Sequence, residues 1–204
     1  MLEPYKKPLR PHYIRRNLMG CLEIALFMRS GVERFSMSYS GMKLSFIIPF
    51  LILPLSIATM IFAHPNQELS AGSIHAIALI YGLRTVLYLA AFTGIMYIMA
   101  RKLNRMEGFT RFVTANNWLV LPAAILMLPL SLAFMGGYYS WEQVYPMMVC
   151  FTLYAYAYTA FMATHALRLP VELGVFVSIC SMAVHQTALD VVRWAGTQGF
   201  MLLA

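Results

Sequence analysis

Charged residues are scarce in this 204-residue chain, and acidic residues are fewer than basic ones. Asp, Glu, Lys and Arg together make up 11% of the sequence, whereas hydrophobic residues make up 60%. A soluble domain averages about a quarter charged residues. A chain this apolar cannot bury its hydrophobic surface in one aqueous core. The composition therefore excludes an ordinary soluble domain and predicts a polytopic membrane protein.

Motifs for enzyme and metal chemistry are also missing. The chain has no G-x-x-x-x-G-K-[ST], G-x-G-x-x-G, H-E-x-x-H or G-x-S-x-G. Its five histidines never pair at a helical spacing of three or four, and its three cysteines form no C-x-x-C. The eight acidic residues are scattered, so no carboxylate pair is visible for hydrolysis. We therefore expect no cofactor, no bound metal and no enzymatic activity.

Long apolar runs dominate what is present. The first, residues 44–63, carries no charge, and a helix of this length reaches about 30 Å, the thickness of the bilayer hydrocarbon. The same polar-to-apolar rhythm repeats along the chain. We predict an all-α bundle of five transmembrane helices (44–63, 74–100, 118–135, 146–163 and 171–191). The transmembrane domain covers residues 44–204 and follows a basic cytoplasmic segment, residues 1–43.

The basic residues are distributed unevenly, and their distribution predicts the orientation. Residues 1–43 hold eight Lys and Arg, residues 101–116 hold four and residues 164–170 hold one, whereas the opposite loops hold Arg193 alone. Cytoplasmic loops of membrane proteins carry such an excess. The net charge of +7 is therefore better explained by membrane orientation than by nucleic-acid binding. We predict a cytoplasmic N-terminus and a C-terminus outside.

The N-terminal segment combines basic residues with a short apolar helix. Asn17 is a candidate cap for a helix over residues 17–30, which is too short to span the membrane. We expect an amphipathic interfacial helix on the cytoplasmic leaflet, and docking against the protein's own spans is equally open. Five basic residues before it would contact anionic lipid headgroups: Lys6, Lys7, Arg10, Arg15 and Arg16.

Prolines interrupt the first and third spans. Pro49 and Pro54 lie in the first and Pro122 and Pro129 in the third, where proline kinks a helix. The segment L-P-L-S-I-A at 53–58 recurs as L-P-L-S-L-A at 128–133, which raises the possibility of a duplication. Part of the basic connector, residues 108–116, is expected to form a second surface-lying helix.

Arg84 is the strongest single candidate for a functional residue, because it is a charged residue within the second span. One interpretation is a site for an anionic ligand or lipid headgroup, and the favoured one is a structural arginine that pairs within the bundle or extends to the interface. We predict Asp190 of the fifth span as its partner, with Gln186 one turn below. The competing partner for Asp190 is Arg193, three residues on.

Two further patterns occur in the last two spans. His185 shares a helical face with Gly174, Ser178 and Ser181, which favours a polar packing seam over a proton relay. A second set of residues follows helical spacing in the fourth span and is expected to pack or to line a lipid groove: Tyr154, Tyr158, Phe161 and His165.

The run G-V-E-R-F-S-M-S-Y-S-G-M-K-L-S-F-I-I-P-F-L-I-L-P (31–54), with N-N-W at 116–118, resembles uncharacterised bacterial integral membrane proteins loosely grouped with the Yip family. The resemblance implies a five-helix bundle with a cytoplasmic N-terminus, in the bacterial inner membrane. Eukaryotic Yip proteins are associated with Rab GTPases, but they have a long soluble N-terminal region that we do not find here. The trafficking role is therefore not expected to carry over.

These patterns support three hypotheses for function. The first is a non-enzymatic membrane protein that organises membrane lipids, anionic ones in particular, or partner proteins, including a second copy of itself. The alternative is a small transporter or channel whose proline-broken helices line a midplane site. The third is an intramembrane enzyme that uses His185 and Asp190. A water-filled path with paired polar residues at mid-depth would distinguish the second from the first.

Overall fold

The computed structural model describes residues 12–62 and 71–203, and within these residues the secondary structure is entirely helical. The helices follow one another along the chain with short connections. Their bounds are α1 (His12–Ala25), α2 (Ser30–Glu33), α3 (Tyr39–Ser45), α4 (Ile48–Phe62), α5 (Ala71–Lys102), α6 (Met106–Trp118), α7 (Val120–Met135), α8 (Trp141–Ala166) and α9 (Val171–Leu203).

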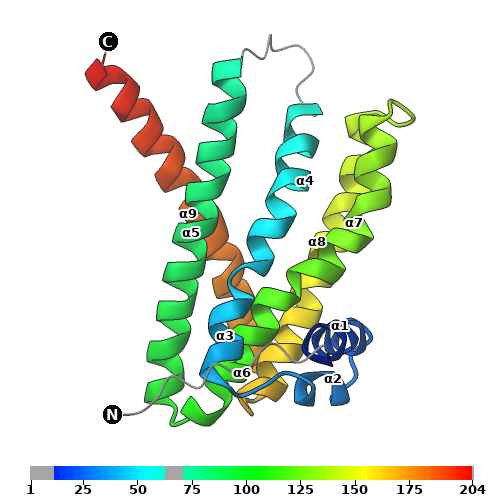
Figure 1. The fold of residues 1–204 in the computed structure, drawn as a ribbon, viewed down its shortest axis with the longest axis vertical. Helices are drawn as coiled ribbons and strands as arrows, with labels where there is room; N and C mark the ends of the chain where they lie inside the picture. Colours follow the sequence, from blue (N-terminus) through cyan, green and yellow to red (C-terminus); the bar gives the residue numbers. More distant parts are fainter. Residues whose placement is uncertain (1–11, 63–70, 204) are drawn as a thin grey trace.

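Five segments are long and apolar enough to cross a membrane, which confirms the predicted fold class. They cover Tyr39–Thr59, Ile74–Lys102, Met106–Met135, Trp141–Ala166 and Val171–Ala195. Helices α4, α5, α7, α8 and α9 rise together as a bundle, while α1, α2 and α6 gather at one end (Figure 1). We call this the basal end.

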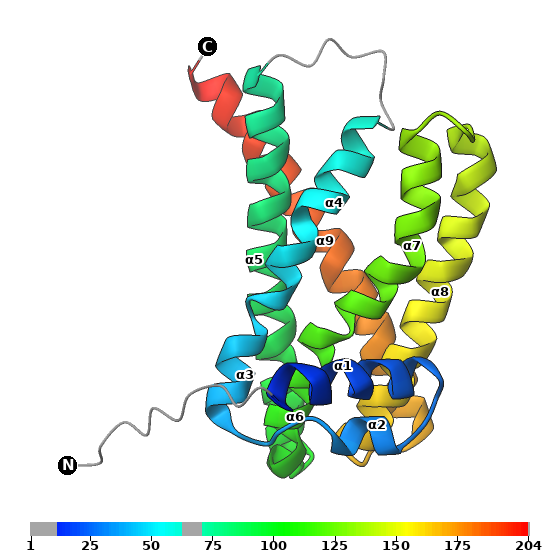
Figure 2. The ribbon, with the colours of Figure 1, turned by 45° about the vertical axis from the view of Figure 1, so that its right-hand side comes forward.

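Helix α1 lies across the basal end, crosswise to the rising spans (Figure 2). The expected start of this helix at Asn17 is wrong. The helix begins at His12, and Asn17 is buried within it with 1% of its surface exposed. The helix ends at Ala25, two residues before Phe27, which has a left-handed backbone (φ 57°) that no α-helix can contain.

Two glycines allow α1 and α2 to contact each other through their backbones. A Cβ on Gly31 would lie 2.7 Å from the carbonyl oxygen of Gly20, and a Cβ on Gly20 would lie 2.8 Å from the ring of Phe35. Any larger residue would push the helices apart. Both glycines are therefore required for the close packing of α1 against α2.

The first and third spans are both interrupted near their basal ends. The first is divided into α3 and α4 at residues 46–47, and the third into α6 and α7 at Leu119. Pro49 and Pro122 lie in the first turns of α4 and α7, where a missing backbone N–H leaves no hydrogen bond unmade. The sequence therefore places a break at each of these points, whereas Pro54 and Pro129 lie inside their helices.

The expectation of a surface-lying helix over 108–116 is wrong. Helix α6 covers this stretch, but it packs into the bundle because Phe109 and Phe112 are buried. A Cβ on Gly108 would lie 2.2 Å from the carbonyl oxygen of Ala166, so α6 also abuts the end of α8. The main apolar core lies here, around side chains such as Phe35 and Phe92.

Candidate functional site

A chamber of about 320 Å³ lies among the spans, and every one of the five spans contributes to its wall. Apolar residues of α4, α5 and α7 form part of the wall, including Leu53, Leu89 and Met127. The rest is polar. Its polar residues are Ser56; Tyr81, Arg84, Thr85 and Tyr88; Asn116 and Asn117; Thr152, Tyr156, Tyr158 and Thr159; and Ser181 and His185.

The two helix interruptions lie beside the chamber and are joined to each other. The side-chain amide of Asn117, next to the α6–α7 break, donates to Ser45 Oγ at the end of α3 over 3.0 Å. The Ser45 hydroxyl in turn donates to the carbonyl oxygen of Met42 over 2.7 Å. Both side chains are buried, so a hydrogen bond that water would weaken elsewhere holds these joints together.

Arg84 extends from α5 into the wall of the chamber. Its guanidinium carbon lies 5.6 Å from the centre of the Tyr81 ring, and its buried Nε has no hydrogen-bond partner among the described residues. A charge at membrane depth costs at least about 2.5–3.5 kcal/mol, so it normally faces a partner or a wet cavity. Arg84 faces a cavity.

The predicted ion pair between Arg84 and Asp190 does not form. Over the described parts of the chain, the ion pair that meets a 4.0 Å limit joins Arg34 and Glu23 at the basal end. His185 lines the chamber, and the five residues to Asp190 turn an α-helix about 140° beyond one full turn. Asp190 and Gln186 are consequently exposed on the outer side of α9.

The alternative pair, Asp190 with Arg193, does not form either, although both residues belong to the described part of α9. Both residues are exposed. The local pairing that sequence spacing allowed is therefore also absent.

Most hydroxyl groups near Arg84 already donate hydrogen bonds within the protein. Thr85, Thr152 and Thr159 each donate to the carbonyl oxygen four residues earlier, over 2.9, 2.8 and 2.8 Å. The Tyr88 hydroxyl shares a 2.8 Å bond with Ser181. Arg84 therefore remains the strongest available donor in the wall.

The polar face of α9 is a packing seam for most of its length. A Cβ on Gly174 would lie 1.9 Å from Thr164 Oγ1 of α8, and Ser178 donates to the carbonyl oxygen of Tyr156 over 2.8 Å. Above them, His185 packs edge-on against Tyr88, with ring centres 5.2 Å apart. The seam thus ends at the chamber, where His185 borders it.

The aromatic stripe of α8 holds α1 in place. The Tyr154 hydroxyl donates to the carbonyl oxygen of Ala25, at the end of α1. Phe27 packs edge-on against both Tyr154 and Phe161, at 5.8 and 5.5 Å between ring centres. The stripe therefore packs against the protein itself. Tyr158, from the same stripe, donates to the Leu119 carbonyl oxygen beside the α6–α7 break.

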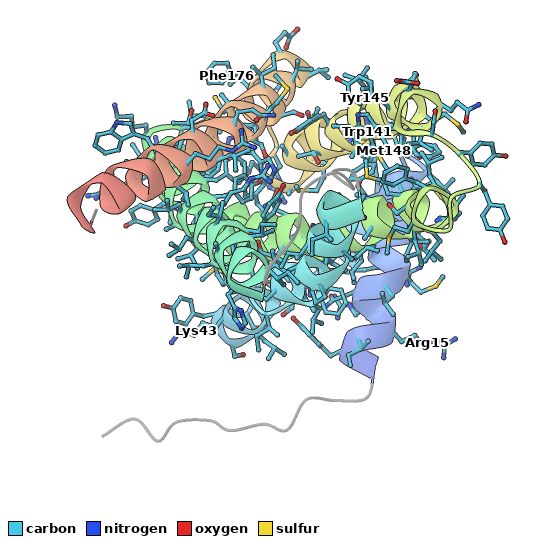
Figure 3. All side chains as sticks on the ribbon, turned by 90° about the horizontal axis from the view of Figure 1, so that it is seen from above. Arg15, Lys43, Trp141, Tyr145, Met148 and Phe176 are labelled. Atoms are coloured by element: carbon cyan, nitrogen blue, oxygen red, sulfur yellow. The ribbon has the colours of Figure 1, made fainter. Side chains whose placement is uncertain are left out.

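The outward side of α1 is apolar and exposed, and basic residues flank it. Ile14, Leu18 and Leu22 recur every four residues and are all exposed. Arg15 and Arg16 are exposed beside them, and Figure 3 shows Arg15 directed away from the bundle. Lys6, Lys7 and Arg10 lie outside the described residues. Helix α1 therefore both docks on the spans and presents an apolar face outward.

No metal or thiol site accompanies the chamber in the part of the chain that the structure describes. No group of three His, Cys, Asp or Glu residues there could hold a metal ion. Cys21, a residue of α1, is buried, and burial raises the pKa of its thiol to about 12. Such a thiol is not a nucleophile at neutral pH.

Sequence reasoning missed most of the chamber, although one signal was available. Tyr81, Arg84, Thr85 and Tyr88 lie at intervals of three and four, which forms a polar stripe in an apolar span. Such a stripe predicts a face turned away from lipid.

Comparison with families of known proteins, with characterised proteins and with solved structures finds no match for this chain. The class of the protein therefore follows from its fold and its chamber. It is an all-α integral membrane protein with five spans, all of which line a chamber of mixed apolar and polar character.

Proposed function

We propose that this protein binds a small ligand in the chamber, as a carrier or channel does. The observation that supports the proposal is a chamber with polar side chains in its wall, to which all five spans contribute, two of them next to helix interruptions. Secondary transporters bind substrates near the membrane midplane where discontinuous helices meet. The second of the three sequence hypotheses is thus the one that the geometry supports best.

The test compares two neighbouring positions on α8. Thr152 lines the chamber, whereas Leu153 is 62% exposed on the outer surface. Each is changed to cysteine in a background with Cys21→Ala, Cys150→Ala and Cys180→Ala. Methanethiosulfonate reagents attack thiolates, which form in water and not in lipid.

We expect Thr152→Cys to react with small water-soluble methanethiosulfonates in the reconstituted protein. Leu153→Cys, the matched control at nearly the same depth, should react at least tenfold more slowly. Equal and negligible labelling at both positions would mean that the chamber is closed to water and solutes. The proposal would then be wrong.

A second function, the organisation of anionic lipids, is supported by α1. Its exposed apolar side and the adjacent Arg15 and Arg16 match the interface of an anionic membrane. This is the role first expected from the sequence, with the Yip-like resemblance. Each basic residue near such a surface contributes about 1 kcal/mol, so binding weakens with added salt.

The lipid role is tested by thermal unfolding in nanodiscs with and without phosphatidylglycerol. We expect Arg15→Gln/Arg16→Gln to remove most of the stabilisation that phosphatidylglycerol provides. The control variant, Arg101→Gln/Lys102→Gln, removes the same amount of charge at the basal end of α5. It should retain the stabilisation that phosphatidylglycerol provides. Equal losses in the two double variants would indicate a general charge effect and contradict a role for α1.

We also propose that both roles are non-enzymatic and are exercised in the inner membrane of a bacterium, with the N-terminus in the cytoplasm. The loop charges support this orientation, because thirteen Lys and Arg lie in the predicted inner segments and one in the outer segments. The missing catalytic motifs support a non-enzymatic role.

A further inference from the structure

We infer that the chamber selects a monoanionic ligand, whose carboxylate or phosphate group binds Arg84 and whose small apolar body fills the rest of the space. This inference rests on the proposed ligand-binding function of the chamber.

The described wall of the chamber holds one positive charge. Among the described residues that line the chamber, Arg84 is the one Lys, Arg, Asp or Glu. Its Nε is buried and has no partner within the described chain. A guanidinium presents five donors in a planar fork, which suits the two oxygens of a carboxylate or phosphate. An anion is therefore the ligand that completes the site.

The surroundings of Arg84 disfavour a cation. Asp190 is exposed on the outer side of α9 and does not line the chamber. The nearby threonine hydroxyls are uncharged, so no negative group in the described wall offsets Arg84. With one uncompensated positive charge, the chamber matches one negative charge.

The size of the chamber limits the rest of the ligand. Its volume of about 320 Å³ is roughly twice that of an apolar cavity of about 150 Å³ that accommodates benzene. A ring or short chain that carries one acidic group fits this space. Leu53, Leu89 and Met127 provide apolar contacts for such a body.

The test measures charge preference directly in the protein with Thr152→Cys. Its labelling rate is compared for a sulfonate-bearing and a trimethylammonium-bearing methanethiosulfonate reagent. We expect the sulfonate reagent to be favoured, and Arg84→Gln to lower the ratio of the two rates by about tenfold. Arg84→Lys retains the charge and should retain most of the ratio.

Two further arms identify the source of the anion. Benzoate is added to protein in neutral nanodiscs, with its uncharged analogue benzamide as the control, and in a separate arm phosphatidylglycerol is included in the nanodiscs. Slower labelling with benzoate but not with benzamide indicates a free solute. Slower labelling with phosphatidylglycerol indicates a lipid headgroup. Either result requires Arg84 and should be lost in Arg84→Gln.

The failure of this inference differs from the failure of the proposed function. If Thr152→Cys reacts with neither reagent, the ligand-binding chamber itself is refuted. If it reacts equally with both, or if Arg84→Gln leaves the ratio unchanged in a protein that elutes as a folded species, the chamber binds a ligand of another charge. Protection by benzamide as strong as that by benzoate would also overturn the selection for an anion.

Discussion

Single glycines decide how closely the helices of this protein approach. At Gly174 a Cβ would lie 1.9 Å from Thr164 Oγ1 and 2.8 Å from the Ala160 carbonyl oxygen, so α8 and α9 are in backbone contact. At Gly94 of α5 a Cβ would meet nothing within 4 Å. An added methyl group would therefore clash at position 174 and meet no atom at position 94, although both glycines lie in membrane helices.

We expect Gly174→Ala to destabilise the protein by about 1–3 kcal/mol, because the new methyl group must displace Thr164 or the helix. Gly94→Ala is the matched control and should be neutral or slightly stabilising, since alanine favours a helix over glycine. The measurement is thermal unfolding of the purified variants in detergent. A loss of stability in Gly94→Ala and none in Gly174→Ala would contradict the packing of α8 and α9.

Glu23 and Arg34 form an ion pair that should make stability depend on pH. Arg34 Nε donates to Glu23 Oε2 over 2.8 Å, and a second bond joins Nη2 to Oε1. These bonds lower the pKa of the Glu23 carboxyl below its usual value. The ionised form is therefore stabilised by folding.

Because the pKa of Glu23 is lower in the folded state, its contribution is complete above the unfolded value of about 4.3 and is lost as the pH falls through the folded value. We expect the unfolding temperature of the wild type to exceed that of Glu23→Gln by a constant amount above about pH 5. The difference should shrink on further acidification and should be absent in an Arg34→Gln background. A difference that grows as the pH falls would overturn this assignment.

Among the elements, the two interrupted spans form one unit. Ser45 and Asn117 are 0% and 2% exposed, and the hydrogen bond between them connects the α3–α4 joint with the α6–α7 joint. Removal of Ser45 leaves the buried Asn117 amide without this acceptor, which costs about 1–3 kcal/mol. The joints should therefore be energetically coupled.

A double-mutant cycle tests this coupling. We expect Ser45→Ala and Asn117→Ala to show a coupling energy of about 0.5–3 kcal/mol in the free energy of unfolding. Thr114 supplies the control, because its hydroxyl donates to the Thr110 carbonyl within its own helix. A cycle of Ser45→Ala with Thr114→Ala should be additive. If both cycles are additive, the joints are independent of each other.

The elements were more predictable than their ends and their mutual contacts. Apolar runs predicted the five spans, because that signal is local in the sequence, whereas only two of the four prolines in the first and third spans, Pro49 and Pro122, lie next to a helix break. The start of α1 was missed since Asn17, a good capping residue, is instead buried by helices that follow much later in the chain. Helix α6 was not predicted to be part of the core, because the helices that bury it are also distant in the sequence.

At the scale of the whole molecule, the orientation remains a prediction from loop charge. Tyr138, between α7 and α8, is 81% exposed, and Glu107, at the basal end, is exposed as well. In the cysteine-free background, Tyr138→Cys should react with a membrane-impermeant thiol reagent in intact cells, and Glu107→Cys should react only after the membrane is opened. The reverse pattern would invert the topology.

The chamber is a property of the whole molecule and could not be located from single spans. Arg84 was recognised because a charge in an apolar run is a local signal. Its predicted partner was wrong, because the rotation of α9 depends on where Gly174 and Ser178 contact α8. Contacts such as that between Tyr88 and Ser181, 93 residues apart, are set by packing that sequence spacing does not encode.

The two residues whose hydrogen bond holds the end of α1 are synthesised at different times. Ala25 and Tyr154, which are hydrogen-bonded, are 129 positions apart in the chain. A ribosome adds about 5–20 residues per second, so about 6–26 s separate the synthesis of the two residues. During this interval α1 has been made but the helix that clamps its end has not. The lipid contact proposed for α1 would therefore precede its contact with the fourth span.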